Sequence, residues 1–404
     1  MRVLIIAQYF PPDMGGGATR AFNAAKGLKA NGCDVVVVAA FPHYPTGNIP
    51  REYRWRIVRV EHVAGIKVIR TFVPPLASRG LANRMVLFLS FVVSSLLALP
   101  FVSRIDVVWA ANPNILSFFP AVVFGLLKRC PVALNVDDLW PEDVHLIGLL
   151  KKDSITFKIA ELLARIAYNK ASLVTPISPG YVRIISGKYG ASPRKVRVIR
   201  GGVDLSKFKP TYGKPTEKNE FIVLYSGAFS IAYDFDQVLK AAKLLENYED
   251  IKFILQGGGE LVDYVKRRIE KLKIRNVKVI DKIISREEVA RLLNEADAVI
   301  LPLKNFGKPY LGISTKLYEY QAVAKPIICC CEGQPADYVK ETKSGIVIKP
   351  GDYKSLAKAI IYLKQNPEIA LRMGLSGRCY VEANLTIDKI GLQMKKAFET
   401  LKHK

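Results

Sequence analysis

Three consecutive glycines, Gly15–Gly17, stand between an apolar run and a segment with helical periodicity. Backbone N–H groups in such a turn can approach a ligand closely, and a helix that begins near Ala18 directs the positive end of its dipole to the same place. Gly16 and Gly17 are therefore candidates to bind a phosphate group or a sugar hydroxyl. The spacing is not the GxGxxG of dinucleotide-binding proteins, so a tight turn without a ligand is the alternative interpretation.

A second group of chemically active side chains lies in the segment Asn135–Glu142, directly after another apolar run. Ligands of open α/β sheets bind outside the carboxyl ends of the strands. Asp138 and Glu142 could accept hydrogen bonds from the hydroxyl groups of an acceptor there, while Trp140 stacks on a sugar ring. The alternative is that Asp137 or Asp138 caps the following helix, with Glu142 in its first turn.

The segment Leu311–Tyr320 begins a helix with two hydroxyl groups and an ammonium group. Ser314 and Thr315 offer hydroxyls beside free backbone N–H donors, and Lys316 adds a charge that attracts phosphate. Glu319 lies one helical turn beyond Lys316 on the same face. This arrangement predicts a diphosphate at the start of the helix and a ribose beside the carboxylate. A surface ion pair between Lys316 and Glu319 is the alternative.

Two other patterns could suggest a metal site, and neither is convincing. Asp234-Phe235-Asp236 matches a DxD metal-binding motif, but Asp234 precedes a helical segment and has Gln237 three residues later, which predicts a helix cap. The four histidines show no metal-ligand spacing. We therefore expect neither a metal nor another cofactor. Gly257–Gly259 follows an apolar run and predicts a βα turn, with Gly258 near a nucleotide base.

Short apolar runs alternate with helix-period segments through most of the chain. Such runs, bounded by Gly, Pro and Asp, are typical of buried parallel strands joined by crossover helices. The runs of the first half are Val3–Ala7, Val35–Ala39, Val107–Ala110, Val132–Val136 and Leu173–Ile177. Those of the second half are Ile222–Tyr225, Lys252–Leu255, Val277–Ile280, Ala298–Leu301, Pro326–Cys330 and Gly345–Ile348. The fold class is therefore α/β, with two mostly parallel, Rossmann-like sheets.

A chain of 404 residues exceeds what one hydrophobic core usually holds, so two domains are expected. The stretch Lys207–Glu220 has neither periodicity and predicts a linker. We expect a first domain at 1–205, a second at 206–376 and a tail helix at 377–404. Within that tail four apolar residues could share one face, namely Ile387, Ile390, Met394 and Phe398.

The formal net charge of +24 and the pI near 9.7 indicate anionic surroundings: nucleic acid, anionic lipid or a phosphorylated substrate. Three of the six cysteines, Cys329–Cys331, stand together in an apolar run, which predicts a buried strand rather than a disulfide framework. A reducing cytoplasm fits this usage. The amino terminus lacks the features of a signal peptide, so we do not expect export.

The segment Met85–Val102 is apolar enough to raise the question of a membrane. A span needs about 20 apolar residues, and this run is short, contains three serines and has Pro100 near its end. A buried crossover helix and a helix that lies against the bilayer are the other interpretations. Basic residues around the segment favour contact with anionic lipid. They are Arg70, Arg79, Arg84 and Arg104.

With these residues in view, the chain resembles glycosyltransferase family 4, the retaining enzymes of the GT-B fold. Within it the chain is similar to surface-polysaccharide transferases that resemble the lipopolysaccharide fucosamine transferases. The resemblance covers nearly the whole chain and depends on the order of its motifs. These are Tyr9-Phe10-Pro11-Pro12 with the following glycines, Pro42-His43-Tyr44-Pro45-Thr46-Gly47, Asp138-Leu139-Trp140-Pro141-Glu142, Gly202-Val203-Asp204, Tyr225-Ser226-Gly227, and Lys316-Leu317-Tyr318-Glu319-Tyr320 with Lys325-Pro326.

The resemblance implies two facing domains, with the acceptor on the first, the nucleotide-sugar on the second, and the final helix crossing back to the first. Glu319 would bind the donor ribose, and the turn at Gly227 would lie at the donor. The family's Glu-x7-Glu signature has Leu311 in place of its first Glu. The basic pair that many members carry after Gly227 is absent, because residues 228–232 are uncharged, so Lys316 is the candidate for the diphosphate.

The implied reaction is transfer, with retention and without a metal, of a hexosyl or N-acetylhexosaminyl group from a UDP- or GDP-sugar. The acceptor would be a glycan or a polyprenyl-linked glycan in surface polysaccharide, lipopolysaccharide or glycoprotein synthesis. The enzyme would contact the cytoplasmic face of an anionic membrane.

Two other functions compete with this one. A non-hydrolysing sugar-nucleotide epimerase shares the fold and would need no acceptor. A nucleic-acid-binding protein would fit the charge, but we find no basic stripe interleaved with aromatics and no reading helix, so nucleic acid is not expected as a partner.

Overall fold

The computed structural model describes the chain except residues 45, 78–79, 112–114, 212–219 and 402–404. It divides into two compact units. The first combines Met1–Gly202 with Ile387–Lys404, and the second is Val203–Thr386. Most of the predicted linker, together with Pro45, Arg79 and His403, lies outside the described residues.

A seven-stranded sheet forms the centre of the first unit, in the order β3-β4-β2-β1-β5-β6-β7. All pairs are parallel except β3 with β4. The strands are β1 (Arg2–Ile6), β2 (Asp34–Ala40), β3 (Val58–Val63), β4 (Ile66–Thr71), β5 (Val107–Ala110), β6 (Val132–Val136) and β7 (Leu173–Pro176). The expected runs of the first half are all strands, which confirms that part of the fold class.

The sequence analysis missed the hairpin of β3 and β4 at the edge of this sheet. Residues of β3 alternate in polarity because one side of an edge strand stays exposed. The two strands are joined at Ala64 and Gly65, both of which have positive φ. This alternation and the Ala-Gly turn were the available signals.

Helices cover both faces of the first sheet. The α-helices are α1 (Gly16–Ala30), α2 (Gly80–Ser95), α3 (Phe118–Lys128), α4 (Glu142–Leu146), α5 (Ile155–Lys170), α6 (Pro179–Arg183) and α14 (Ile387–Glu399). Shorter turns are the 3-10 helices η1 (Arg51–Tyr53), η2 (Leu96–Phe101), η3 (Ile115–Ser117) and η5 (Pro193–Lys195), and the π-helical η4 (Ile184–Lys188).

The apolar segment expected at Met85–Val102 forms α2 and η2, which connect β4 to β5. The stretch Ala82–Phe101 has a mean hydropathy of 2.0 and is long and apolar enough to cross a membrane, on length and composition alone. Its inner side packs on β2 and β4, so it is a crossover helix of the sheet. Its outer side carries exposed apolar residues, which are Val86, Leu89, Val93, Leu97 and Phe101.

The second unit contains a six-stranded parallel sheet in the order β10-β9-β8-β11-β12-β13. Its strands are β8 (Phe221–Ser226), β9 (Ile251–Gln256), β10 (Val277–Ile280), β11 (Ala298–Pro302), β12 (Ile327–Cys330) and β13 (Gly345–Ile348). In chain order this is the 3-2-1-4-5-6 arrangement of a Rossmann fold. The strand order therefore reverses between β8 and β11, which confirms the second half of the predicted fold class.

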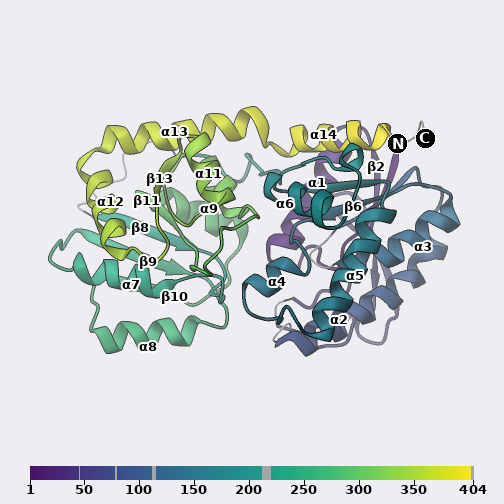
Figure 1. Cartoon of the computed structure of the whole chain (residues 1–404), viewed down its shortest axis with the longest axis horizontal. Coiled ribbons are helices and arrows are strands. Elements are labelled where there is room, and N and C mark those ends of the chain that lie inside the picture. The colour runs from purple at the N-terminus through teal and green to yellow at the C-terminus, as the bar shows by residue number, and fades with distance from the viewer. Residues whose placement is uncertain (45, 78–79, 112–114, 212–219, 402–404) are drawn as a thin grey trace. The chain divides into compact units, whose positions relative to one another are not determined.

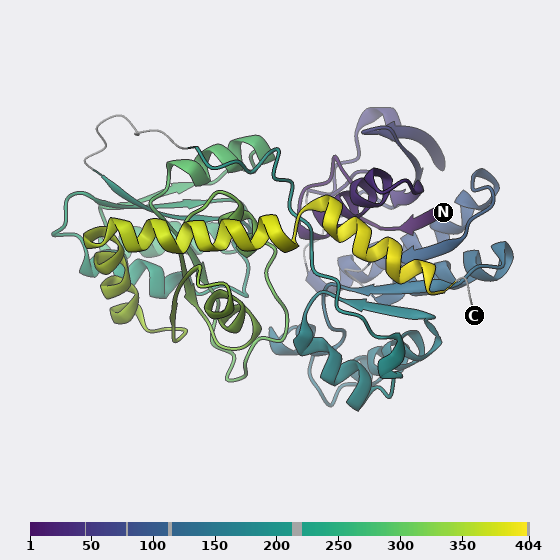
Figure 2. The ribbon, with the colours of Figure 1, turned by 90° about the horizontal axis from the view of Figure 1, so that it is seen from above.

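In the described part of this unit, seven helices surround the sheet and complete its core. They are α7 (Phe235–Leu244), α8 (Val262–Leu272), α9 (Arg286–Glu295), α10 (Lys316–Ala322), α11 (Gln334–Glu341), α12 (Tyr353–Gln365) and α13 (Pro367–Asn384). Figure 1 labels all of them except α10, and Figure 2 shows α13 running along the second unit. All six cysteines of the chain are free, and Cys329–Cys331 is buried, as the apolar run predicted.

The tail contains two helices where the sequence analysis expected one. Helix α13 ends at Asn384 and α14 begins at Ile387, and all of α13 belongs to the second unit. The structure therefore divides the chain after Gly202 and after Thr386 rather than after 205 and 376. The reason is that α13 packs on α10, α12 and β13 of the second unit before the chain returns to the first unit.

Helix α14 crosses back to the first unit and packs on α1, as Figure 1 shows. Its buried face consists of the four residues that the tail pattern singled out, together with Gly391 and Ala397. A Cβ on Gly391 would lie 2.1 Å from the backbone of Gly27 in α1, so the two helices touch backbone to backbone. Two glycines thus permit the closest contact between the ends of the chain.

The variant Gly391→Ala is expected to destabilise the first unit, because the added methyl group has no room against Gly27. Overpacking costs about 1–3 kcal/mol, which exceeds the gain of about 1 kcal/mol that alanine brings to a helix. Urea denaturation followed by circular dichroism measures the loss. Gly187→Ala is the matched control, since a Cβ there meets nothing within 4 Å. Equal denaturation midpoints for both variants would contradict the backbone contact.

Candidate functional site

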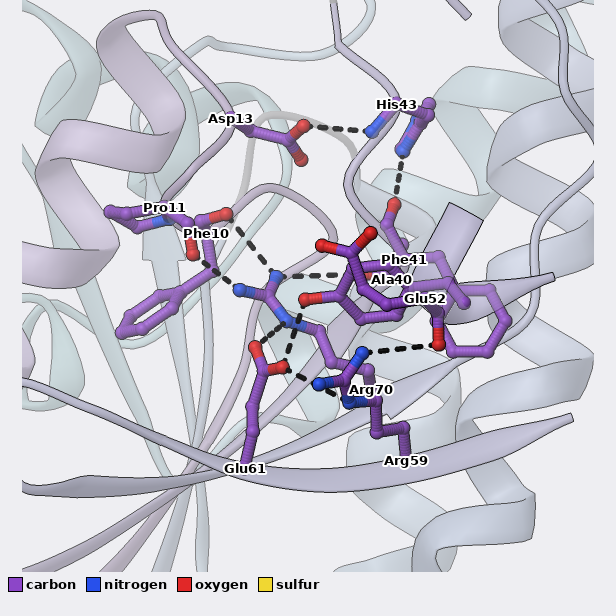
Figure 3. A network of polar contacts seen from close by, with 11 residues as sticks. Phe10, Pro11, Asp13, Ala40, Phe41, His43, Glu52, Arg59, Glu61 and Arg70 are labelled. Atoms are coloured by element: carbon purple, nitrogen blue, oxygen red, sulfur yellow. Dashed lines mark hydrogen bonds and ion pairs between the residues drawn. The ribbon is translucent and has the colours of Figure 1, made fainter. Parts of the chain in front are cut away.

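Two loops meet at the carboxyl edge of the first sheet through a buried carboxylate. Asp13 follows β1, and its Oδ1 accepts hydrogen bonds from the backbone N–H groups of His43 (2.8 Å) and Tyr44 (2.9 Å), which follow β2. Burial raises the pKa of Asp13 and lowers that of His43. Figure 3 shows the bond from Asp13 to the His43 backbone. The predicted motif around His43 is thereby joined to the glycine turn.

Arg70 lies fully buried in β4 and holds the start of the same turn (Figure 3). Its Nη1 donates to the carbonyl of Phe10 at 3.2 Å, and its Nη2 donates to the carbonyl of Pro11. Its Nε donates to Glu61 at 2.8 Å, so the buried charge has an anionic partner. A buried guanidinium with full hydrogen bonding fixes the loop geometry that the sequence analysis could only name as a turn.

The glycine turn itself has the predicted strand-turn-helix form. Helix α1 begins at Gly16, and Gly15 precedes it with φ +140° and no side-chain cap. The first N–H groups of a helix lack intrahelical partners. The backbone at Gly16 and Gly17 can therefore donate to an anion or a hydroxyl, and a ligand at this place stays a prediction.

The segment after β6 differs from the predicted cap. Helix α4 starts at Glu142, its N-cap is Pro141, and no side chain caps it. The alternative that Asp137 or Asp138 caps this helix is therefore wrong, while Glu142 does lie in the first turn. Trp140 packs edge-on against Phe88 of α2, with ring centroids 6.3 Å apart.

The three carboxylates of the segment after β6, namely Asp137, Asp138 and Glu142, have different surroundings. Asp137 forms an ion pair with the buried Arg20, with Oδ1 and Nε 3.4 Å apart. Glu142 accepts hydrogen bonds at 2.7 Å from both Lys188 and Tyr189, which fixes its Oε1 within the unit. Asp138 reaches solvent. Of the two predicted acceptor carboxylates, Asp138 is the better placed to meet a ligand.

Asp143 is a neighbour of this group that the sequence analysis missed. Its Oδ2 accepts from the backbone N–H of Leu139 at 2.7 Å and from the hydroxyl of Tyr181 at 2.6 Å. Burial raises the pKa of Asp143 to about 6. Loss of hydration, followed by the charges of Asp143 and Asp137, also raises the pKa of Asp138, although that residue reaches solvent at the surface. Crowded carboxyls of this kind gather at functional sites.

In the second unit the side chain of Lys316 lies directly on Gly227. A Cβ on Gly227 would meet the Lys316 Cε at 1.9 Å and its Nζ at 2.6 Å. The ammonium group donates to the Tyr233 hydroxyl at 2.8 Å and lies 4.8 Å from the centre of that ring. Among the described residues no carboxylate pairs with Lys316. Its charge therefore remains available to an anionic ligand.

This contact lies at the reversal of the strand order. Gly227 directly follows β8, and Lys316 begins the helix reached from β11, so the two belong to the two strands between which the order reverses. The turn after β9 lies beside the turn at Gly227, because the N–H of Phe229 donates to the carbonyl of Gly258 at 2.9 Å. Ligands of open α/β sheets bind at such a reversal.

Glu319 has a partner that the sequence analysis missed. Its Oε1 pairs with Nη2 of Arg286, the first residue of α9, and Arg286 also stacks on the ring of Phe208 at 4.9 Å. The alternative of a surface pair between Lys316 and Glu319 is therefore wrong. Spacing along one helix could not reveal an arginine that comes from another helix. Ser314 and Thr315 are half-buried just before Lys316, as expected.

The DxD sequence is a helix cap, as predicted. Asp234 accepts from the backbone N–H of Gln237 at 3.2 Å at the start of α7. Gln237 does not complete a capping box, because its side chain bonds to Leu303 and Gly351 instead. Asp236 pairs with Arg268 at 2.8 Å. Within the described part of the chain no three His, Cys, Asp or Glu side chains gather as a metal site.

Two known protein families match most of the chain. Residues 15–202 match the glycosyl transferase 4-like domain, and residues 209–378 match glycosyl transferases group 1. The probable glycosyltransferase WbjE of Pseudomonas aeruginosa is 26% identical over 295 residues, which are 70% of this chain and 72% of that one. The O-antigen chain mannosyltransferase C of Escherichia coli is 28% identical over 166 residues, which are 41% and 43% of the two chains.

Solved structures share the fold over almost the full length. Sucrose-phosphate synthase from Thermosynechococcus elongatus has a TM-score of 0.79 at 18% identity, covering 99% of this chain and 98% of its own. HepE from Anabaena in complex with UDP has a TM-score of 0.71 at 15% identity, covering 99% of this chain and all of its own. HepE is also known in complex with UDP-glucose.

The variant Asp143→Asn is expected to remove part of the pH dependence of stability. The folded pKa of about 6 lies above an unfolded value of about 3.9, so this carboxyl stabilises the fold below about pH 4 and the effect is lost as the pH rises toward 6. Asparagine does not titrate, and its oxygen can still accept from Leu139 and Tyr181.

Relative to the wild type, the variant should gain roughly 3 kcal/mol in the free energy of unfolding as the pH rises from about 4 to 7, because about two pKa units at 1.36 kcal/mol each separate the folded and unfolded carboxyl. Urea titrations at several pH values measure this difference. A difference between the two proteins that stays constant over the whole range would contradict the raised pKa.

Proposed function

We propose that this chain, a glycosyltransferase with the GT-B fold, transfers a hexosyl or N-acetylhexosaminyl group from a UDP- or GDP-sugar with retention. The acceptor is a glycan or a polyprenyl-linked glycan in surface polysaccharide, lipopolysaccharide or glycoprotein synthesis. The observation that carries the proposal is the ammonium group of Lys316 on Gly227, which bonds to Tyr233 and pairs with no carboxylate of the described residues, at the reversal of the second sheet. Two named neighbours support the substrate classes, since HepE has been solved in complex with UDP-glucose and the E. coli relative is named an O-antigen chain mannosyltransferase.

The proposed donor site stabilises a leaving diphosphate. When the bond between the anomeric carbon and the diphosphate oxygen breaks, negative charge grows on that oxygen, and a fixed cation in a partly buried place stabilises it. Lys316 supplies this charge, and Tyr233 orients it. The absence of a side chain at Gly227 leaves the room in which the ammonium group lies. In this mechanism the leaving phosphate accepts the proton of the acceptor hydroxyl on the same face, and no metal is needed.

The other residues proposed to contact the donor lie at the same carboxyl edge of the second sheet. The carboxylate of Glu319 accepts hydrogen bonds from the ribose hydroxyls, and Arg286 holds that carboxylate in place. The hydroxyl groups of Ser314 and Thr315 donate hydrogen bonds to the diphosphate. The backbone at Gly258, in the turn after β9, lies beside the nucleotide base. We infer these roles from position and chemistry together.

The acceptor side is assigned to the first unit. Asp138 accepts a hydrogen bond from an acceptor hydroxyl, and the backbone at Gly16 and Gly17 contacts the donor phosphate or the acceptor. Glu142 acts indirectly, because Lys188 and Tyr189 already hold it and it fixes the segment that carries Asp138. Neither residue serves as a nucleophile in this mechanism.

Two helices of the first unit support contact with an anionic membrane. The outer face of α2 is apolar, and α5 exposes a second apolar stripe that the sequence analysis missed. Both helices pack on η3. Basic residues lie along the α5 stripe, which suits the interface of an anionic bilayer. The stripe consists of Ile155, Ile159, Leu162 and Ile166, with Lys158 and Arg165 between them. We place the enzyme at the cytoplasmic face of the cell membrane.

The variant Lys316→Ala is expected to lower kcat/KM for the donor by roughly 100-fold, because one preorganised charge at the leaving group is lost. Release of UDP and GDP from a panel of nucleotide-sugars, with membrane lipid extract as acceptor source, measures the rate. Lys340→Ala, an exposed lysine on α11, is the control. Equal rates for the two variants would remove Lys316 from the donor site.

The double variant Ile159→Glu/Leu162→Glu is expected to weaken binding to phosphatidylglycerol vesicles by about tenfold or more, because two apolar side chains no longer enter the interface. Cosedimentation measures the bound fraction. Leu244→Glu/Leu371→Glu makes the same charge change at exposed leucines of the second unit. If both pairs of substitutions weaken binding equally, charge alone attracts the protein and the α5 stripe plays no part.

A further inference from the structure

A cavity of about 500 Å³ opens in the first unit beside the loops that follow β2 and β4. It lies at the carboxyl edge of the sheet, one strand further out than the glycine turn after β1. The loop at Phe41–Tyr44 connects the two places, because Phe41 lines the cavity and His43 and Tyr44 bind Asp13. The volume lies within the range of about 300–1,000 Å³ that small-molecule sites occupy.

Three aromatic rings, here called the floor, line this cavity: Phe41 and Tyr53 are buried, Phe72 is exposed, and Phe41 packs on both of the others. The ring centroids of Phe41 and Tyr53 are 5.2 Å apart, and those of Phe41 and Phe72 are 6.4 Å apart at nearly a right angle. The Tyr53 hydroxyl donates to Glu61 at 2.8 Å, and Glu61 pairs with the buried Arg70 seen in Figure 3. The floor is therefore held by the same network that fixes the turn after β1.

The rim of the cavity is cationic and carries an exposed indole. Arg54 and Arg56 line the cavity and flank Trp55, whose surface is completely exposed. Trp55 has φ +62°, a conformation that a bulky residue rarely adopts without a functional reason. Of the described residues that line the cavity, none is acidic.

We propose that this cavity binds the phosphate end of an apolar chain, the lipid carrier of the acceptor. The apolar floor takes the first carbons of the chain, and Arg54 and Arg56 take the phosphate oxygens, which guanidinium groups bind in pairs of hydrogen bonds. Trp55 covers the junction, since an indole suits the boundary between apolar and polar surroundings. The inference rests on the proposed function only in naming the ligand as part of the acceptor.

A bare glycan fits this cavity less well. A sugar ring could stack on the exposed rings of Trp55 or Phe72, so aromatic contact alone does not distinguish the two ligands. The charge does, because a glycan offers no negative group to the two arginines. The apolar floor and the cationic rim together select an amphiphile.

Farnesyl monophosphate is the probe, and tryptophan emission is the readout. It should bind saturably and change the emission, whereas farnesol, inorganic phosphate and N-acetylglucosamine should bind at least about tenfold more weakly, since each lacks one half of the recognised structure. In Trp55→Phe the emission change should vanish while calorimetry still detects binding. No binding of farnesyl monophosphate, or equal binding of any of the other three, would overturn the proposal.

The double variant Arg54→Ala/Arg56→Ala should raise the Kd for farnesyl monophosphate by about tenfold or more, because both phosphate ligands are removed. Arg183→Ala/Arg194→Ala removes the same charge at exposed arginines of the same unit and should leave the Kd unchanged. An equal effect of the two double variants would overturn the site.

Phosphatidylglycerol vesicles distinguish a lipid carrier from the bilayer itself. The vesicles are added at the concentration of lipid phosphate at which farnesyl monophosphate saturates the change in Trp55 emission, and they should not change that emission. An equal change would assign this surface to general membrane contact instead. Failure of the proposed function has a different signature. Farnesyl monophosphate would then bind while no nucleotide-sugar is consumed.

Discussion

Parallel strands bring all their carboxyl ends to one edge of a sheet, and every proposed ligand contact of this protein depends on that constraint. In the second sheet the order reverses between β8 and β11, so the turn at Gly227 and the helix start at Lys316 meet there. The close approach needs a residue without a side chain at 227. A single glycine thus determines where the charge of the lysine lies and what it can stabilise.

The first unit differs in its electrostatics, because it buries both positive and negative side chains at the carboxyl edge of its sheet. Arg70 is fully buried and is balanced by Glu61, and Arg20 is balanced by Asp137. Asp143 is stabilised by hydrogen bonds from Tyr181 and a backbone N–H rather than by a cation. These groups fix the loops beside Asp138, for which we propose a contact with the acceptor.

Most of the fold could be predicted from the sequence, since buried parallel strands such as β5 and β11 are short apolar runs with turn residues around them. The edge hairpin was not predicted, because β3 is half-exposed and polar and because Lys67 and Arg70 interrupt the apolar residues of β4. Within the site, the segments around Gly16, Asp138 and Lys316 were found because each combines a strand end with a helix start. Arg286 and Asp143 were not, because their contacts join residues that no local pattern connects.

The proposed donor site requires that the second unit bind a nucleoside diphosphate through protein groups alone. Isothermal titration of the full chain with UDP and GDP, in buffer containing EDTA, is the decisive measurement. Saturable binding of at least one of the two is expected, with an affinity that falls as salt screens the ammonium group. Absence of binding by both, or binding that appears only when a divalent cation is restored, would contradict the proposed donor site.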